Sequence, residues 1–130
     1  MTSKGYLLDS NVLYWLSVDE RRLGKEAVRV IRSKSIYFSS ISVAELLAKA
    51  KSGRLKFLKD PVDHWKDFGI QPLSFFLDEA SHFTSFSAHE IPDPFDRMIM
   101  ATARANNLNL LTSDRGMLSQ GFPWVLDATT

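Results

Sequence analysis

The chain has 130 residues, no cysteine, and 16 Lys and Arg residues against 15 Asp and Glu residues. This length predicts a single domain over residues 1–130, with a core large enough to need no cross-links. The absence of cysteine excludes disulfides and thiolate metal sites, so any metal must bind oxygen or histidine. The amino terminus is too polar for a signal peptide or a membrane span, so we expect a cytoplasmic protein without membrane contact.

Short apolar runs alternate with helical patterns along the chain. Residues 6–8, 36–38 and 108–111 have strand-like composition, and residues 70–73 and 124–126 have it more weakly. Apolar residues at helical spacing predict three helix faces: Leu23, Ala27, Val30 and Ile31; Val43, Leu46, Leu47 and Ala50; Phe95, Met98, Ile99 and Thr102. This alternation indicates the α/β class, with a largely parallel sheet and helices on both faces. In such sheets ligands bind beyond the carboxyl ends of the strands.

Four acidic side chains are expected to meet at that edge. Asp9 and Asp114 directly follow strand-like runs, and Glu45 and Asp96 lie in the first turns of predicted helices. Carboxylates that converge raise one another's pKa, and a divalent cation removes that penalty. Oxygen ligands select hard ions, so we expect Mg²⁺, or alternatively Mn²⁺. The pattern therefore predicts these four acids as metal ligands and catalytic groups.

Each of these acids also has an ordinary structural explanation, which the sequence leaves open. Asp9 can cap the helix that follows it, and Asp114 can be a turn or cap residue. Ser42 and Glu45 fit a capping box, in which Ser42 would begin the helix. These explanations account for an acid at each helix start, but they do not require the acids to meet.

Asp93 and Asp96 share one helix start and are assigned different roles. Asp93 precedes a proline, the favoured first helical residue, so we assign it to capping. Asp96 either complements the helix dipole or projects toward the shared site. The three histidines, His64, His82 and His89, have no metal-binding spacing. There is also no P-loop or GxGxxG turn, so no nucleotide cofactor is expected.

The chain resembles the PIN-domain family and, within it, the VapC-type toxins of bacterial toxin–antitoxin pairs. The resemblance covers nearly the whole chain and rests on YLLDSNVL at 6–13, SVAEL at 42–46, DPFDRM at 93–98 with ATA at 101–103, and LLTSD at 110–114. It implies a three-layer α/β/α sandwich around a mainly parallel sheet, and a metal-binding role for the same four acids. Where relatives often have Asp-Thr-His, this chain has Asp9-Ser10-Asn11, which keeps the acid.

The resemblance also suggests which residues support the acids. We expect Ser10, Asn11 and Thr112 to contact the metal ligands rather than the metal. Arg97 and Arg115 each follow a site acid directly. Both are candidates for phosphate contacts, and an equally good alternative is a salt bridge that orients the neighbouring carboxylate.

The function implied by the resemblance is that of a Mg²⁺-dependent endoribonuclease acting as the toxin of a toxin–antitoxin pair. Such an enzyme would hydrolyse RNA with water that the metal activates, leaving a 5′-phosphate and a 3′-hydroxyl. A housekeeping RNA-processing nuclease is the first alternative. A non-catalytic PIN-like binding module ranks last, because all four acids are present.

The implied partners are an RNA substrate, a cognate antitoxin protein and a second copy of the chain in a homodimer. We expect the antitoxin to dock on the helix Val43–Ala50 and on Leu55–Leu58, where apolar residues are interleaved with the basic run Lys49–Lys59.

Overall fold

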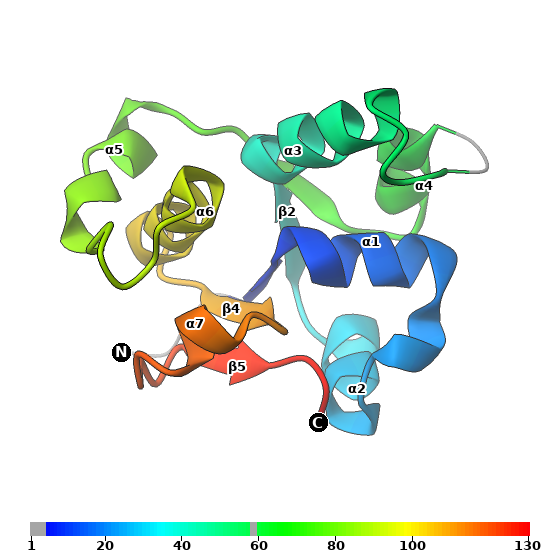
Figure 1. Cartoon of the computed structure of the whole chain (residues 1–130). Coiled ribbons are helices and arrows are strands. Elements are labelled where there is room, and N and C mark those ends of the chain that lie inside the picture. Colours follow the sequence, from blue (N-terminus) through cyan, green and yellow to red (C-terminus); the bar gives the residue numbers. More distant parts are fainter. Residues whose placement is uncertain (1–4, 58–59) are drawn as a thin grey trace.

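The fold is built on a five-stranded sheet in which every pairing is parallel (Figure 1). The structure, a computed structural model, describes residues 5–57 and 60–130, so Leu58 and Lys59 of the predicted docking and basic segments lie outside the described residues. The strands are β1 Tyr6–Leu8, β2 Ile36–Ser39, β3 Gln71–Leu73, β4 Asn109–Thr112 and β5 Val125–Asp127, in the order β3-β2-β1-β4-β5. Each strand matches its predicted range to within one residue at either end, and the predicted fold class is confirmed.

Helices cover both faces of this sheet. They are α1 Ser10–Val18, α2 Lys25–Ser33, α3 Ser40–Lys51, α4 Pro61–Asp67, α5 Leu77–Ala80, α6 Pro94–Ala105 and α7 Arg115–Leu118, with 3₁₀ turns η1 Glu20–Arg22 and η2 Phe83–Ser85. Figure 1 shows α1, α2 and α4 on one side of the sheet and α5 and α6 on the other. Because successive strand residues point to opposite faces, Leu8 joins the core beneath α1 while Leu7 joins the core beneath α6.

The start of α3 differs from the prediction. Its N-cap is Ser39, the last residue of β2, whose Oγ accepts the N–H of Ile41 at 3.0 Å. The capping box of Ser42 and Glu45 is therefore wrong, and both residues lie inside the helix. This shift removes the ordinary explanation of Glu45, because its side chain is too far along α3 to satisfy the first N–H groups.

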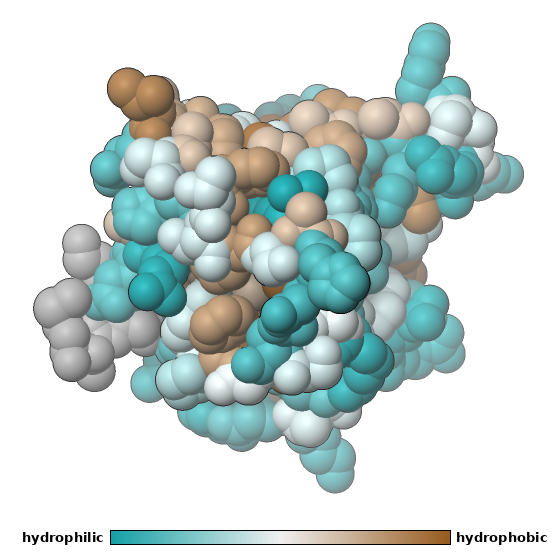
Figure 2. Space-filling view, turned by 60° about the vertical axis from the view of Figure 1, so that its left-hand side comes forward, coloured by the Kyte–Doolittle hydropathy of each residue, from teal (hydrophilic) through white to brown (hydrophobic). Residues whose placement is uncertain are grey.

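Two apolar residues do not share the helix faces predicted for them. Leu23 is buried but precedes α2, which begins at Lys25. Leu47 is 44% exposed on the outer side of α3. Phe76 and Leu77, which lead into α5, are also exposed. Figure 2 brings the side of the molecule that carries α5 forward and shows hydrophobic residues among hydrophilic ones across this face.

Within residues 5–57 and 60–130, no helix has the length and apolar character needed to cross a bilayer.

Candidate active site

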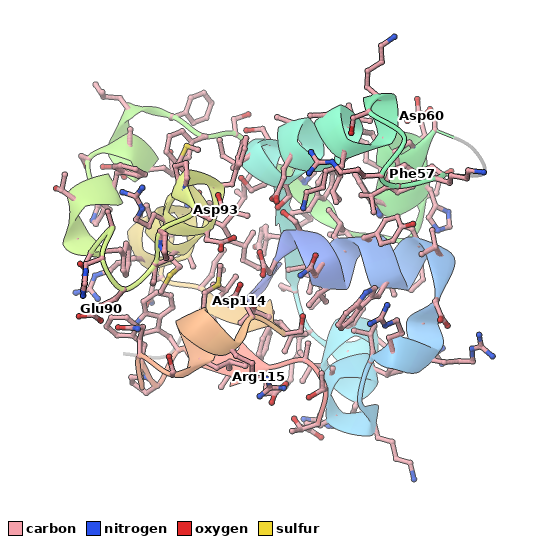
Figure 3. The ribbon with its side chains drawn as sticks, viewed as in Figure 1. Phe57, Asp60, Glu90, Asp93, Asp114 and Arg115 are labelled. Carbon is pink, nitrogen blue, oxygen red and sulfur yellow. The ribbon has the colours of Figure 1, made fainter. Side chains whose placement is uncertain are left out.

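The four predicted acids line one polar pocket beyond the carboxyl ends of β1 and β4. The pocket has a volume of about 220 Å³ and is lined by Asp9, Ser10, Asn11, Glu45, Lys49, Asp93, Asp96 and Asp114. In Figure 3 the labelled Asp93 at the start of α6 and Asp114 at the start of α7 lie beside the N-terminal end of α1. The convergence that the parallel sheet predicts is thus present in the structure.

Asp9 is the most enclosed of these acids, with 3% of its surface exposed. Its Oδ1 accepts the N–H of Ser10 at 2.8 Å, and its Oδ2 accepts the hydroxyl of Thr112 at 2.7 Å. The pKa of the Asp9 carboxyl is raised to about 6: burial is the largest cause, the charges of Glu45 and Asp114 add to it, and the two hydrogen bonds act in the opposite direction. Asp9 therefore caps α1 and lines the pocket at the same time.

Glu45 is held by one neutral and one charged donor. Its Oε1 accepts the hydroxyl of Ser10 at 2.7 Å, and its Oε2 lies 3.0 Å from the Nζ of Lys49. The Oγ of Ser10 also lies 3.0 Å from the Oγ of Ser42. Ser10 therefore connects the start of α1 to the middle of α3 and fixes Glu45 beside Asp9.

Asp96 has the least compensated charge in the pocket. The structure gives its carboxyl no hydrogen-bond partner among residues 5–57 and 60–130. The pKa of Asp96 is raised to about 8, first by burial and then by the charges of Asp9, Asp93, Asp114 and Glu45. Near neutral pH this acid would keep its proton unless a cation were bound.

Asp93 and Asp114 are both helix N-caps. The Oδ1 of Asp93 accepts the N–H of Phe95 at 2.9 Å, and the Oδ1 of Asp114 accepts the N–H of Met117 at 2.9 Å. Each of these hydrogen bonds uses one carboxyl oxygen. Capping a helix and lining the pocket are therefore compatible roles for both residues.

Two of the three predicted supporting residues, Thr112 and Ser10, hydrogen-bond to the acids. The Thr112 hydroxyl donates to Asp9 and accepts the N–H of Asp114 at 3.0 Å, so it ties these two acids together. Ser10 bonds to Asp9 through its N–H and to Glu45 through its hydroxyl. The exposed Asn11 lines the pocket.

The two predicted arginines point elsewhere. The Arg97 guanidinium lies over the ring of Phe83, 4.8 Å from its centroid, and its Nη2 donates to the Pro92 carbonyl at 3.4 Å. Arg115 pairs with Asp127 at 3.0 Å, on the β5 side of α7 (Figure 3). Neither arginine lines the pocket, and the ion pair of Arg115 does not go to the acid that precedes it. Their contact with phosphate stays a prediction.

Two pocket residues were not foreseen as part of the site. Lys49 was assigned only to a basic run, although its place four residues after Glu45 puts the two side chains on one face of a helix. Asp93 was assigned only to capping. Its spacing of three residues from Asp96 is the signal that both could face one pocket.

The chemistry of the donors fits a hard divalent cation. The acids contribute oxygen ligands. The pKa values of Asp9 and Asp96 are raised first by burial and then by the charges of neighbouring acids. No three carboxylate or imidazole groups in the described part of the chain converge tightly enough to hold an ion as they stand. The carboxylates would have to move closer together to bind one.

Comparison with known proteins places the chain in a family. The PIN domain model matches residues 6–122. Ribonuclease VapC22 of Mycobacterium tuberculosis is 33% identical over 125 residues, which cover 90% of this chain and 92% of that protein. A toxin-antitoxin complex from Klebsiella pneumoniae superposes with a TM-score of 0.67 at 20% identity, covering 94% of this chain and 96% of that one. VapBC2 from Rickettsia felis, bound to a DNA fragment from their promoter, superposes with a TM-score of 0.65 at 16% identity over the same shares.

The chain belongs to the PIN-domain family. Its sequence is related to that of a VapC ribonuclease, and the two solved structures share its fold. Nucleases of this family generally use a divalent metal.

Proposed function

We propose that this chain is a VapC-type endoribonuclease, the toxin of a toxin–antitoxin pair, which hydrolyses RNA phosphodiester bonds with Mg²⁺. The observation that carries this proposal is the pocket of four acids, in which the pKa of Asp96 is raised to about 8. A structural cluster would be expected to balance its charges, whereas a metal site leaves them to be balanced by the ion. The relationship to a ribonuclease of the VapC type supports the substrate.

In this proposal Asp9, Glu45, Asp96 and Asp114 hold the metal. Oxygen donors favour Mg²⁺, and Mn²⁺ has the same preference for them. When bound, such an ion lowers the pKa of a water molecule and stabilises charge on the scissile phosphoryl group. Attack by water on the phosphorus, with the ribose 3′-oxygen as the leaving group that takes up a proton, leaves a 5′-phosphate and a 3′-hydroxyl.

The side chains around the acids fix their positions and limit their charge. Thr112 and the N–H of Ser10 hold both oxygens of Asp9, so this carboxylate has one orientation. Lys49 offsets the charge of Glu45 and reduces the repulsion of an approaching phosphate. The N-terminus of α6 opens at the pocket and favours an anion there.

We further propose two protein partners. The solved relatives include toxin–antitoxin complexes, which supports an antitoxin that docks near α3. The exposed fractions of Phe76 and Leu77, 67% and 86%, support a contact between two copies of the chain. A housekeeping nuclease would share the chemistry but would not arrest growth.

The test is inducible expression in a bacterial host, with growth and the 5′ ends of cellular RNA as readouts. Wild type should arrest growth and create new 5′-phosphate ends. Asp9→Asn should do neither. It should lower cleavage in vitro at least about a hundredfold, because loss of a metal ligand costs more activity than loss of a group that hydrogen-bonds to a ligand. Asp67→Asn, an exposed acid on α4, is the matched control and should behave as wild type.

The outcomes separate the two functions. Arrest by Asp9→Asn would contradict the catalytic role of the pocket. Cleavage by wild type without arrest would favour the housekeeping nuclease.

A further inference from the structure

A second pocket adjoins the acidic one between α3 and the start of α6. It has a volume of about 420 Å³ and is lined by Glu45, Ala48, Lys49, Arg54, Asp93, Pro94 and Phe95. Glu45, Lys49 and Asp93 line both pockets, so the two cavities share a wall. A ligand that reacts in the acidic pocket and extends past this wall would enter the second one.

The lining of the second pocket differs from that of the first. Ala48, Pro94 and Phe95 give it an apolar side, whereas Lys49 and Arg54 add two cations. This combination of an aromatic ring and cations suits a ligand that has both a flat apolar part and a negative charge.

Arg54 is held near this pocket by local contacts. Its backbone N–H donates to the Lys49 carbonyl at 2.9 Å, and its Nε donates to the Ser52 hydroxyl at 3.1 Å. Both bonds leave the Nη groups of the guanidinium available to a ligand. A planar guanidinium suits phosphate because it can donate two parallel hydrogen bonds.

We propose that the second pocket binds the nucleotide next to the scissile phosphate of a single-stranded RNA, with Phe95 stacking on its base and Arg54 binding its phosphate. This inference rests on the proposed ribonuclease function. A base can reach an aromatic side chain in this way only when it is not stacked in a duplex. The volume falls within the range of about 300–1,000 Å³ typical of small-ligand sites.

The charges around the pocket are compatible with this occupant. Glu45 and Asp93 would repel a phosphate, but Lys49 is paired with Glu45 and Asp93 accepts the N–H of Phe95. Arg54 lies on the part of the wall that the acidic pocket does not share. A phosphate bound there would be separated from the acids that hold the metal.

The experiment measures RNA binding by the full chain carrying Asp9→Asn, which keeps the RNA intact. The probes are a fluorescein-labelled single-stranded RNA of mixed sequence and an abasic ribose-phosphate chain of the same length, each titrated by anisotropy at several salt concentrations. Arg54→Ala should weaken binding of both probes and lower the slope of log K against log salt by about 0.7. Phe95→Leu should weaken binding of the RNA about tenfold, leave the salt slope unchanged, and leave binding of the abasic chain unchanged.

Matched controls remove the same side chains outside both pockets. Arg104→Ala takes an exposed arginine from the last turn of α6, and Phe68→Leu alters an exposed ring at the end of α4. Both should bind the two probes as the parent protein does. Circular dichroism of every variant checks the fold.

The results distinguish failure of this inference from failure of the proposed function. If wild type cleaves RNA but Arg54→Ala and Phe95→Leu bind it normally, the proposed nucleotide site is wrong while the proposed ribonuclease function is retained. The second pocket would then be a site for a peptide partner. Equal weakening of both probes by Phe95→Leu would overturn stacking. If wild type neither cleaves nor binds RNA, the function fails and this inference fails with it.

Discussion

Glu79 and Asp96 are acids near opposite ends of α6, and their surroundings differ sharply. Glu79 is 6% exposed, yet its Oε1 accepts the N–H of Phe76 at 2.9 Å and its Oε2 accepts the side-chain amide of Asn106 at 3.0 Å. Asp96 lies among other carboxylates and lacks such donors in the described part of the chain. Burial of a carboxylate therefore does not by itself indicate a functional site. A buried carboxylate indicates a functional site when it lies among other carboxylates and lacks hydrogen-bond donors.

The largest effect is expected when Asp96 is replaced by Asn. RNA cleavage should fall at least about a hundredfold, since a proposed metal ligand is lost. The melting temperature without metal should stay the same or rise, because asparagine is neutral without a bound proton, whereas Asp96 must keep a proton at neutral pH to stay uncharged in the pocket. Cleavage assays and thermal unfolding with and without Mg²⁺ measure both effects, and Mg²⁺ should stabilise wild type but not the variant. Near-normal cleavage by Asp96→Asn would contradict its role.

Replacing Glu79 by Gln should have the opposite result. Glutamine keeps one acceptor for the N–H of Phe76, but its amide nitrogen then faces the amide nitrogen of Asn106. The free energy of unfolding should fall by about 1–2 kcal/mol while cleavage stays within about twofold of wild type. Urea unfolding and cleavage assays test this, with the exposed Glu90→Gln as the control. A loss of cleavage at unchanged stability would mean that Glu79, like Asp96, is needed for cleavage rather than for folding.

The strands β1, β2 and β4 were predictable because each contains a compact apolar run, and in parallel sheets such runs are buried on both faces. The edge strand β3 is largely exposed and gave a weaker pattern. The start of α3 was not predictable from its sequence. The spacing of Ser42 and Glu45 satisfies the capping-box pattern, but β2 passes into the helix without a loop and Ser39 becomes the cap. A local pattern cannot distinguish two helix starts three residues apart, because both place a serine before the same apolar face.

The meeting of the acids was predictable for a topological reason. Parallel strands place their carboxyl ends at one edge, so an acid after β1 and an acid after β4 must lie near each other. The directions of Arg97 and Arg115 were not predictable. They depend on Phe83 and Asp127, each more than ten residues away in the sequence. Their positions follow from tertiary packing, which spacing does not encode.

The smallest expected effect is a change in melting temperature with pH, which again distinguishes Asp96 from Glu79. The pKa values of Asp9 and Asp96 are raised from 3.8 to about 6 and about 8, so the folded protein keeps protons that the unfolded chain has already released. Their contribution to stability is therefore complete below about pH 4 and is lost as the pH rises, for Asp9 by about pH 6 and for Asp96 by about pH 8.

With a chelator present, thermal unfolding of wild type should show a melting temperature that falls by a few degrees between about pH 6 and pH 8. Asp96→Asn should lose this dependence, whereas Glu79→Gln should keep it at a lower overall stability. Mg²⁺ should reverse it in wild type, because the ion binds the ionised acids that accumulate as the pH rises. An identical pH dependence in wild type and Asp96→Asn would mean that the uncompensated charge lies elsewhere in the pocket.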